Sequence, residues 1–354
     1  MKRIKVLVVD DSAVARQLLS NYLARDPAIT VVGTAPDPYL AWERIRALAP
    51  DVLTLDVDMP RMDGVTFLEK LMHRRPMPVV MVSSLTAAGC ATTLRALELG
   101  AIDFVTKPTV GLREAFPDLA AELTEKVKIA ASASLRRPSP GPTPHARPLA
   151  SRGLRTMQRL IAIGASTGGT EALREFLTVL PADAPAVLVV QHMPEHFTRA
   201  FANRLDGLCS VRVREAEDGD PALPGHVLIA PGNRHMRLVR DGTAYRVGIA
   251  VDPPVNRHRP SVDVLFHSCA ELAGPNAVGI IMTGMGDDGA RGLLAMRHAG
   301  ATTLAQDEAS CVVFGMPKTA IQLGAADHVV PLGRLAETAL ACTHEPVAAL
   351  RRVP

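Results

Sequence analysis

The first third of the chain alternates short apolar runs with longer segments in which apolar residues recur every three or four positions. The short runs predict buried strands, and the longer segments predict helices. Continuous apolar strands that alternate with helices are typical of a parallel sheet covered by helices on both faces. The pattern therefore predicts an α/β domain over residues 1–125, with strands at residues 4–11, 29–35, 51–60, 78–84 and 101–108.

The same alternation restarts near residue 157 and predicts a second domain over residues 155–346. Helix-like segments lie between several of its strands, so we expect a doubly wound, mainly parallel α/β domain here as well. Its strands are expected at residues 158–166, 184–194, 225–232, 276–289 and 301–308.

A proline-rich stretch separates the two predicted domains. Prolines stand at positions 138, 140, 142, 144 and 148. Proline removes a backbone donor and fixes φ, so neither a helix nor a sheet is expected to continue through this stretch. Residues 126–154 are therefore expected to form a helical tail and a Pro-rich linker. This linker either acts as a passive spacer or transmits a signal between the domains.

Composition narrows the possible functions. The chain has 354 residues, too many for one ordinary core, and its net charge is only +3. Only 3% of residues are aromatic and the basic pairs are scattered, which argues against nucleic-acid binding. The five cysteines include no C-x-x-C pair and are expected to be reduced thiols. No apolar run approaches the roughly 18 residues of a membrane span, so we expect a cytoplasmic protein without membrane insertion.

Polar residues end the predicted strands of the first domain: Asp10 and Asp11, Asp56, Ser83 and Lys107. The carboxyl ends of parallel strands meet at one edge of a sheet, so we expect these groups to gather there. Three carboxylates repel one another unless a cation lies between them, and an oxygen-only set suits Mg²⁺. One aspartate can then attack a phosphoryl donor while Lys107 neutralises the charge. For Asp11 alone, a helix cap is the simpler explanation.

The second domain begins with the segment IGASTGG, in which Ser166 lies among small residues between a strand and a helix. It is either a phosphate-binding loop or a turn that presents a nucleophile. The segment lacks the second glycine of G-x-G-x-x-G and the lysine of a P-loop. Glu171 in the first helical turn also disfavours a phosphate. The spacing G-x-S-x-G, which places a serine on a sharp strand-to-helix turn, favours the nucleophile.

A serine nucleophile needs a base and an orienting carboxylate. His192 follows the apolar run VLVVQ, which places it at the same sheet edge as Ser166. Asp287 and Asp288 follow the run VGIIM, and their spacing alone does not choose between them. The chain order serine, histidine, aspartate differs from that of α/β-hydrolases. The sequence therefore predicts the same chemistry on a different sheet.

The first domain resembles the response-regulator receiver domain, a flavodoxin-like (βα)5 fold. The motifs VLVVDDS, LTLDVDMPRMDG, PVVMVSS and AIDFVTKP carry this resemblance in order. The resemblance implies that Asp56 accepts a phosphoryl group. It also implies a Mg²⁺ ion held by Asp10, Asp11, Asp56 and the backbone carbonyl of Asp58.

The same resemblance implies how the receiver responds to the phosphoryl group. Ser83 would hydrogen-bond to it and Lys107 would pair with it. Phe104 stands at the position of an aromatic switch residue, where it would act by ring burial because it has no hydroxyl. Pro108 would follow a cis peptide bond.

The second domain resembles the catalytic domain of the CheB family of chemotaxis protein-glutamate methylesterases. The motifs IGASTGG, VQHMP, RPSVD, TGMGDDGARG and QDEASCVVFGMP carry the resemblance. It implies a catalytic triad of Ser166, His192 and Asp288. It also implies an oxyanion donor at the backbone amide of Met285, and the amide of Thr167, next to the nucleophile, is a candidate for a second donor. Many members have asparagine just before the triad aspartate, so the aspartate at position 287 adds a negative charge beside the triad.

Together, the two resemblances imply a phosphorylation-activated serine hydrolase for chemotaxis adaptation. It would demethylate glutamate methyl esters and deamidate glutamines on methyl-accepting chemotaxis receptors, with no cofactor for hydrolysis. A CheA-type histidine kinase would be the phosphodonor. The alternative is a phosphorylation-dependent binding or scaffold module with an inactive hydrolase-like domain.

Overall fold

The computed structural model describes residues 3–84, 86–107, 112–134, 149 and 159–344. It divides into two compact units, residues 1–141 and residues 142–354. The predicted Pro-rich linker, apart from Leu149, and the peptide bond before Pro108 lie outside the described residues. The domain boundaries stay a prediction, and the one expected at residue 125 falls within a helix that runs from Leu112 to Ser132.

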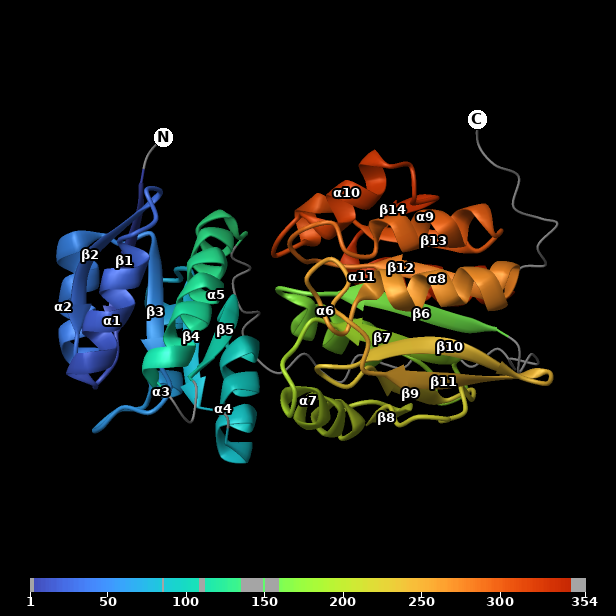
Figure 1. Cartoon of the computed structure of the whole chain (residues 1–354), viewed down its shortest axis with the longest axis horizontal. Coiled ribbons are helices and arrows are strands. Elements are labelled where there is room, and N and C mark those ends of the chain that lie inside the picture. The colour runs from blue at the N-terminus through green and yellow to red at the C-terminus, as the bar shows by residue number, and fades with distance from the viewer. Residues whose placement is uncertain (1–2, 85, 108–111, 135–148, 150–158, 345–354) are drawn as a thin grey trace. The chain divides into compact units, whose positions relative to one another are not determined.

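The first unit is a five-stranded parallel sheet with strand order β2-β1-β3-β4-β5 (Figure 1). Its strands are β1 (Ile4–Val9), β2 (Ile29–Ala35), β3 (Val52–Asp56), β4 (Val79–Ser84) and β5 (Asp103–Lys107). Its helices are α1 (Ala13–Leu23), α2 (Pro38–Leu48), α3 (Gly64–Arg74), α4 (Ala87–Glu98) and α5 (Leu112–Ser132). Helices α1 and α5 pack together, and α3 packs against α4. The predicted parallel α/β sheet of five strands is confirmed.

Local sequence explains where these helices begin. The side chains of Ser12, Asp37, Asp63 and Thr86 each accept a backbone N–H of the first turn of the helix that follows. Such caps satisfy donors that have no partner within the helix. All five residues of β3 are buried, as expected for a central strand of a sheet covered on both faces.

The second unit is built on a seven-stranded sheet with strand order β14-β13-β12-β6-β7-β9-β8. All its neighbouring strands are parallel. The strands are β6 (Leu160–Ala165), β7 (Ala186–Gln191), β8 (Arg212–Glu215), β9 (His226–Ile229), β12 (Ala277–Ile281), β13 (Thr302–Gln306) and β14 (His328–Val330). The prediction of a second, mainly parallel α/β domain is confirmed.

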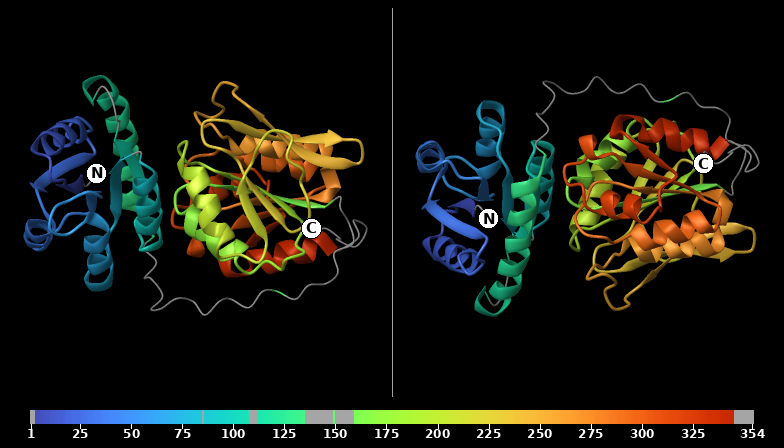
Figure 2. Two further views of the ribbon diagram at one scale, coloured as in Figure 1. Left: turned by 90° about the horizontal axis from the view of Figure 1, so that it is seen from below. Right: turned by 90° about the horizontal axis from the view of Figure 1, so that it is seen from above.

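Helices cover both faces of this sheet. Figure 2 shows α8 and α11 on opposite sides of it. Helix α8 packs against α9, and α11 packs against α6. The helices are α6 (Gly169–Leu177), α7 (Phe197–Asp206), α8 (Val262–Leu272), α9 (Ala290–His298), α10 (Met316–Gln322) and α11 (Leu332–His344), with short 3-10 turns at Gly274–Asn276 and Glu308–Ser310.

An antiparallel hairpin was not predicted. It consists of β10 (His235–Asp241) and β11 (Ala244–Ala250), and it packs against α8. Its sequence signal is the pair Asp241-Gly242 between two segments of partly alternating polarity. The strands β8 and β14 were also missed, because they are only 4 and 3 residues long.

The order of the central strands places a topological switch point at β6. The chain passes from β6 to β7 on one side, and β12 lies on the other side of β6. Ligands of open α/β sheets bind beyond the carboxyl ends of strands at such a point. Among the described helices, none is both long enough and apolar enough to cross a bilayer.

Candidate functional site

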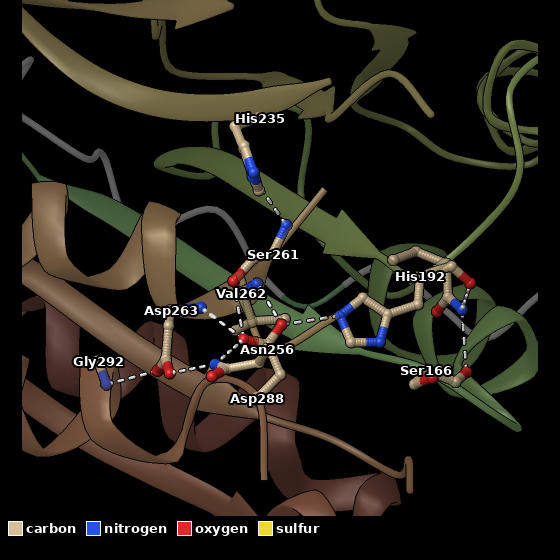
Figure 3. Close-up of polar contacts among 10 residues, drawn as sticks. Ser166, His192, His235, Asn256, Ser261, Val262, Asp263, Asp288 and Gly292 are labelled. Atoms are coloured by element: carbon tan, nitrogen blue, oxygen red, sulfur yellow. Dashed lines mark hydrogen bonds and ion pairs between the residues drawn. The ribbon is translucent and has the colours of Figure 1, made fainter. Parts of the chain in front are cut away.

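Three predicted site residues follow three adjacent strands at this switch point. Ser166 follows β6 and His192 follows β7, and the residues before them, Ala165 and Gln191, are partners across the two strands. Asp288 lies in the loop after β12. Figure 3 shows the imidazole of His192 between Asp288 and Ser166. Residues 166, 192 and 288 therefore lie at the same edge of the sheet.

A tight turn presents Ser166. Its backbone amide donates to the carbonyl of Thr283 at 3.0 Å, and its own carbonyl accepts the amide of Gly169 at 2.7 Å. Gly168 between them has φ of +78°, a conformation that favours glycine. A Cβ atom on Gly284 would lie 2.7 Å from the Cβ of Ser166. The glycine at position 284 thus lets the loop after β12 approach the serine closely.

The imidazole of His192 is held by Asp288 and not by Asp287. His192 Nε2 lies 2.8 Å from Asp288 Oδ2. A carboxylate only accepts hydrogen bonds, so Nε2 carries the proton and the lone pair is on Nδ1. Among the described residues, none hydrogen-bonds to Nδ1, and no hydrogen bond joins His192 to Ser166. Catalytic hydrogen bonds are often long without substrate and tighten in the complex.

Asp288 is almost completely buried, with 1% of its surface exposed. Its Oδ1 accepts from Asn256 Nδ2 and Ser261 Oγ, both at 2.7 Å. Its Oδ2 accepts from the backbone amide of Val262 at 2.7 Å as well as from His192. Burial alone would raise the pKa of Asp288, but His192 and the bonds from Asn256 and Ser261 hold it well below its usual value. The carboxylate is therefore ionised and fixed in orientation.

Sequence reasoning missed three of the groups around the predicted triad. Ser261 lies in the motif RPSVD but was given no role, and Asn256 and His258 were not singled out. The ring of His258 stacks on that of His192, with centroids 3.8 Å apart and an angle of 10° between the planes. Burial and the neighbouring His192 lower the pKa of His258 to about 4. Since these residues lie in a loop without periodicity, no local pattern marked them.

The two predicted oxyanion donors lie in the loops beside Ser166. Thr167 is buried, and its carbonyl accepts the hydroxyl of Thr283 at 3.0 Å. Met285 follows Gly284, and 49% of its surface is exposed. Both residues therefore border the turn that carries the serine.

The predicted phosphorylation site lies at the carboxyl edge of the N-terminal sheet. Lys107 Nζ lies 2.9 Å from Asp10 Oδ2 and 2.9 Å from Asp56 Oδ1. The carboxylates of Asp10, Asp11 and Asp56 each offer an oxygen within 4.8 Å of the others. Burial, with a contribution from Asp10, raises the pKa of Asp56 to about 6. This oxygen-only, strongly negative set fits a small divalent cation such as Mg²⁺.

The other predicted receiver residues lie around this set. Asp58 is exposed, and its backbone amide hydrogen-bonds to Asp56. The buried Ser83 on β4 accepts a hydrogen bond of 2.6 Å from Thr93 on α4. Phe104 on β5 is buried, and Lys126 Nζ lies 5.2 Å from the centre of its ring.

Two family profiles match the chain. The profile for CheB methylesterase matches residues 161–339, and the profile for the response regulator receiver domain matches residues 6–114. The chain belongs to the CheB methylesterase family. The family and the enzyme class predicted from the sequence are thus confirmed, and so is the receiver fold of the first unit.

Several CheB-family relatives match along almost the whole chain. A protein-glutamate methylesterase/protein-glutamine glutaminase of Bordetella bronchiseptica is 61% identical over 342 residues, 96% of this chain and 97% of the relative. A protein of the same name from Escherichia coli is 58% identical over 341 residues, 96% of this chain and 97% of the relative. The CheB methylesterase catalytic domain of Thermotoga maritima is similar in structure, with a TM-score of 0.51 and 38% identity. The match covers 52% of this chain and 97% of that domain.

Proposed function

We propose that the C-terminal unit hydrolyses glutamate methyl esters, with Ser166 as nucleophile, His192 as base and Asp288 as orienting carboxylate. The observation that carries this proposal is the 2.8 Å contact of His192 Nε2 with Asp288 Oδ2 at the sheet edge where Ser166 also lies. With the proton on Nε2, the lone pair on Nδ1 is available to activate the serine.

In the first half of the reaction, Ser166 Oγ attacks the ester carbonyl carbon and its proton passes to His192 Nδ1. The backbone amides of Thr167 and Met285 donate hydrogen bonds to the oxyanion that forms. When the intermediate collapses, the bond to the methoxy oxygen breaks, and His192 returns the proton to release methanol. Asp288 stabilises the imidazolium while His192 carries the extra proton.

In the second half, water attacks the acyl-enzyme carbonyl carbon and gives a proton to His192. When this intermediate collapses, the bond from the carbonyl carbon to Ser166 Oγ breaks, Ser166 takes the proton back from His192, and the glutamic acid side chain that forms loses its proton to water. A glutamine side chain can follow the same route with ammonia as the leaving group. An amide is the poorer electrophile, so the ester is the faster substrate. These steps use side chains, backbone amides and water and require no cofactor.

The substrates that we propose are methylated glutamates and glutamines on methyl-accepting chemotaxis receptors. The names of the relatives support this proposal, since they describe both a methylesterase and a glutaminase. Those enzyme names disfavour the alternative of an inactive scaffold. A cytoplasmic location stays a prediction, with which the five free cysteines are compatible.

We also propose that Asp56 is the phosphoacceptor and that its phosphorylation by a CheA-type histidine kinase activates the hydrolase. Asp10, Asp11, Asp56 and the carbonyl of Asp58 would hold Mg²⁺, which supplies positive charge for the phosphoryl oxygens. Lys107, now paired with two carboxylates, would pair with the phosphoryl group. Ser83 would hydrogen-bond to the phosphoryl group, and burial of the Phe104 ring would carry the switch.

The experiment that tests the hydrolase is methanol release from methylated receptor, with and without a small-molecule phosphodonor and Mg²⁺. Ser166→Ala should lower turnover roughly 10⁶-fold, as loss of a triad serine does in other hydrolases. Ser210→Ala, at an exposed serine of the same unit, is the matched control. Demethylation by Ser166→Ala at a rate near that of the wild type would refute the assignment. If a serine-directed phosphonate left Ser166 unlabelled while receptor binding persisted, the scaffold alternative would be favoured.

A further inference from the structure

A tight turn at residues 255–258 approaches both Asp288, the proposed orienting carboxylate, and His192, the proposed base. The amide of Val255 donates to the carbonyl of His258 at 3.1 Å, and the amide of His258 donates to the carbonyl of Val255 at 2.9 Å. Asn256 and Arg257 between them have φ of +51° and +66°. Positive φ at both central residues is the geometry of a type I′ turn, for which asparagine is well suited.

The first central residue of the turn joins two buried carboxylates. Asn256 Nδ2 lies 2.7 Å from Asp288 Oδ1 and 2.7 Å from Asp263 Oδ2, as Figure 3 shows. Both partners are acceptors, so the amide nitrogen and not the amide oxygen must face them. The NH₂ group of Asn256 therefore uses both of its protons to hold two acidic side chains.

The second carboxylate is itself fixed to the scaffold. Asp263, at the start of α8, is 5% exposed, and its Oδ1 accepts the backbone amide of Gly292 on α9 at 2.7 Å. Burial raises the pKa of Asp263, and the charge of Asp288 raises it further. Two buried carboxylates repel each other, and the amide of Asn256 offsets this repulsion because it donates to both.

We infer that Asn256 is a positioning residue for ester hydrolysis, because it ties the Oδ1 atom of Asp288 to the packed helices α8 and α9. This inference rests on the proposed role of Asp288. With Oδ1 held by Asn256 and Ser261, the other oxygen stays directed at His192 Nε2. The last residue of the same turn, His258, stacks on the imidazole that Asp288 orients. One short turn thus controls both partners of the pair that activates Ser166.

The test compares Asn256→Asp and Asn256→Gly in the full-length chain, because both replacements tolerate the left-handed backbone. Methanol release from methylated receptor is measured as kcat and KM across pH. Asn233→Asp and Asn233→Gly are matched controls, since Asn233 also has positive φ, at +60°, but bonds to Arg259 and Glu195. A loss of roughly 10- to 100-fold in kcat with little change in KM is expected for both Asn256 variants.

The pH profile separates positioning from a merely structural role. Asn256→Asp adds a carboxylate beside Asp288, so the acid limb of kcat/KM should move to higher pH by roughly one unit. Asn256→Gly removes the donor without adding a charge and should move this limb less. The titratable or charged groups near Asp288 are His192, His258, Asp263, Asp287 and Arg257.

Two results would overturn the inference. The first is that both Asn256 variants keep the kcat of the wild type and the acid limb of its kcat/KM profile. The second is a loss of kcat that matches the loss of folded protein in thermal melts, with the acid limb unmoved. The activity of Ser166→Ala shows whether the inference alone fails or the proposed function fails with it. If Ser166→Ala is inactive while the Asn256 variants behave as the wild type, only the inference is wrong.

Discussion

The imidazole rings of His192 and His258 stack face to face, with centroids 3.8 Å apart and 10° between their planes. The stack, together with the Asp288 bond, leaves the ring of His192 little freedom to rotate. A charge on His258 at this distance from a second imidazole is unfavourable. Because the pKa of His258 is lowered to about 4 by burial and by His192, His258 is neutral at neutral pH.

This neutral histidine predicts a pH dependence of stability. The pKa of His258 lies below its usual value of 6.5, so folding favours the neutral form. Above pH 6.5, His258 is neutral in both the folded and the unfolded chain and does not reduce the free energy of unfolding. As pH falls from 6.5 towards 4, the unfolded chain takes up a proton at His258 before the folded chain does, so stability is lost. His258→Gln, which stays neutral throughout, should therefore lose less stability than the wild type across this window. Urea unfolding of the wild type and of His258→Gln, at pH 7.5 and between pH 6.5 and 4, gives the free energy of unfolding of each. An equal loss of this free energy in the two proteins would contradict the prediction.

The contact between His192 and Asp288 predicts unequal effects of removing two adjacent charges. Asp288→Asn should lower kcat by roughly 10⁴-fold, because an amide no longer enforces the tautomer with its proton on Nε2. Asp287→Asn should change kcat only a few-fold, because Asp287 is exposed and Asp288 makes the contact with the ring. Steady-state methanol release measures both variants. Equal losses for the two would show that Asp288 is not the orienting carboxylate.

The close approach of Gly284 to Ser166 predicts that a methyl group at position 284 lowers both stability and turnover. The Cβ of Gly284→Ala would lie 2.3 Å from Met316 Sδ and 2.7 Å from Ser166 Cβ. Such overpacking costs about 1–3 kcal/mol of unfolding free energy, and displacement of the serine should also lower kcat. Gly207→Ala is the matched control, since its nearest neighbour would lie at 3.6 Å and its φ is −70°. Chemical unfolding gives the free energy of unfolding of both variants, and methanol release gives their kcat. Equal values for Gly284→Ala and Gly207→Ala would contradict the predicted crowding.

The carboxylate cluster of the N-terminal unit predicts stabilisation by Mg²⁺. A cation that binds only the folded form adds about 2.7 kcal/mol at a concentration 100 times its Kd. Added Mg²⁺ should raise the melting temperature of this unit, and a chelator should reverse the rise. Asp11→Asn should weaken the response, whereas Glu43→Gln, the same loss of charge at an exposed residue of α2, should not. A full response in Asp11→Asn would remove this residue from the predicted metal site.

Much of the fold was predictable because the relevant signal is local. The apolar runs that became β3, β6, β7 and β12 are buried on both faces, and this burial leaves a continuous pattern in the sequence. A polar residue directly after such a run must lie at the carboxyl edge of the sheet. For this reason the sequence alone predicts that Ser166 and His192 lie at one edge. The hairpin β10–β11 was missed because polar and apolar residues do not alternate fully along it. Met236 and Leu238 are apolar and buried, but Val239 is an apolar residue at an exposed position.

The sequence by itself determined two doubly wound sheets, the family, and the strand ends that carry the predicted functional side chains. Only the tertiary structure decided how the predicted triad is held. It places the carboxylate of Asp288, which the resemblance had implied, against the imidazole, and it brings Asn256 to that carboxylate from 32 positions away. The physical reason is that hydrogen bonds from a turn depend on how helices and sheet pack around it. A hydrophobic pattern records which face of an element is buried, but not which polar groups from distant loops meet beyond its end.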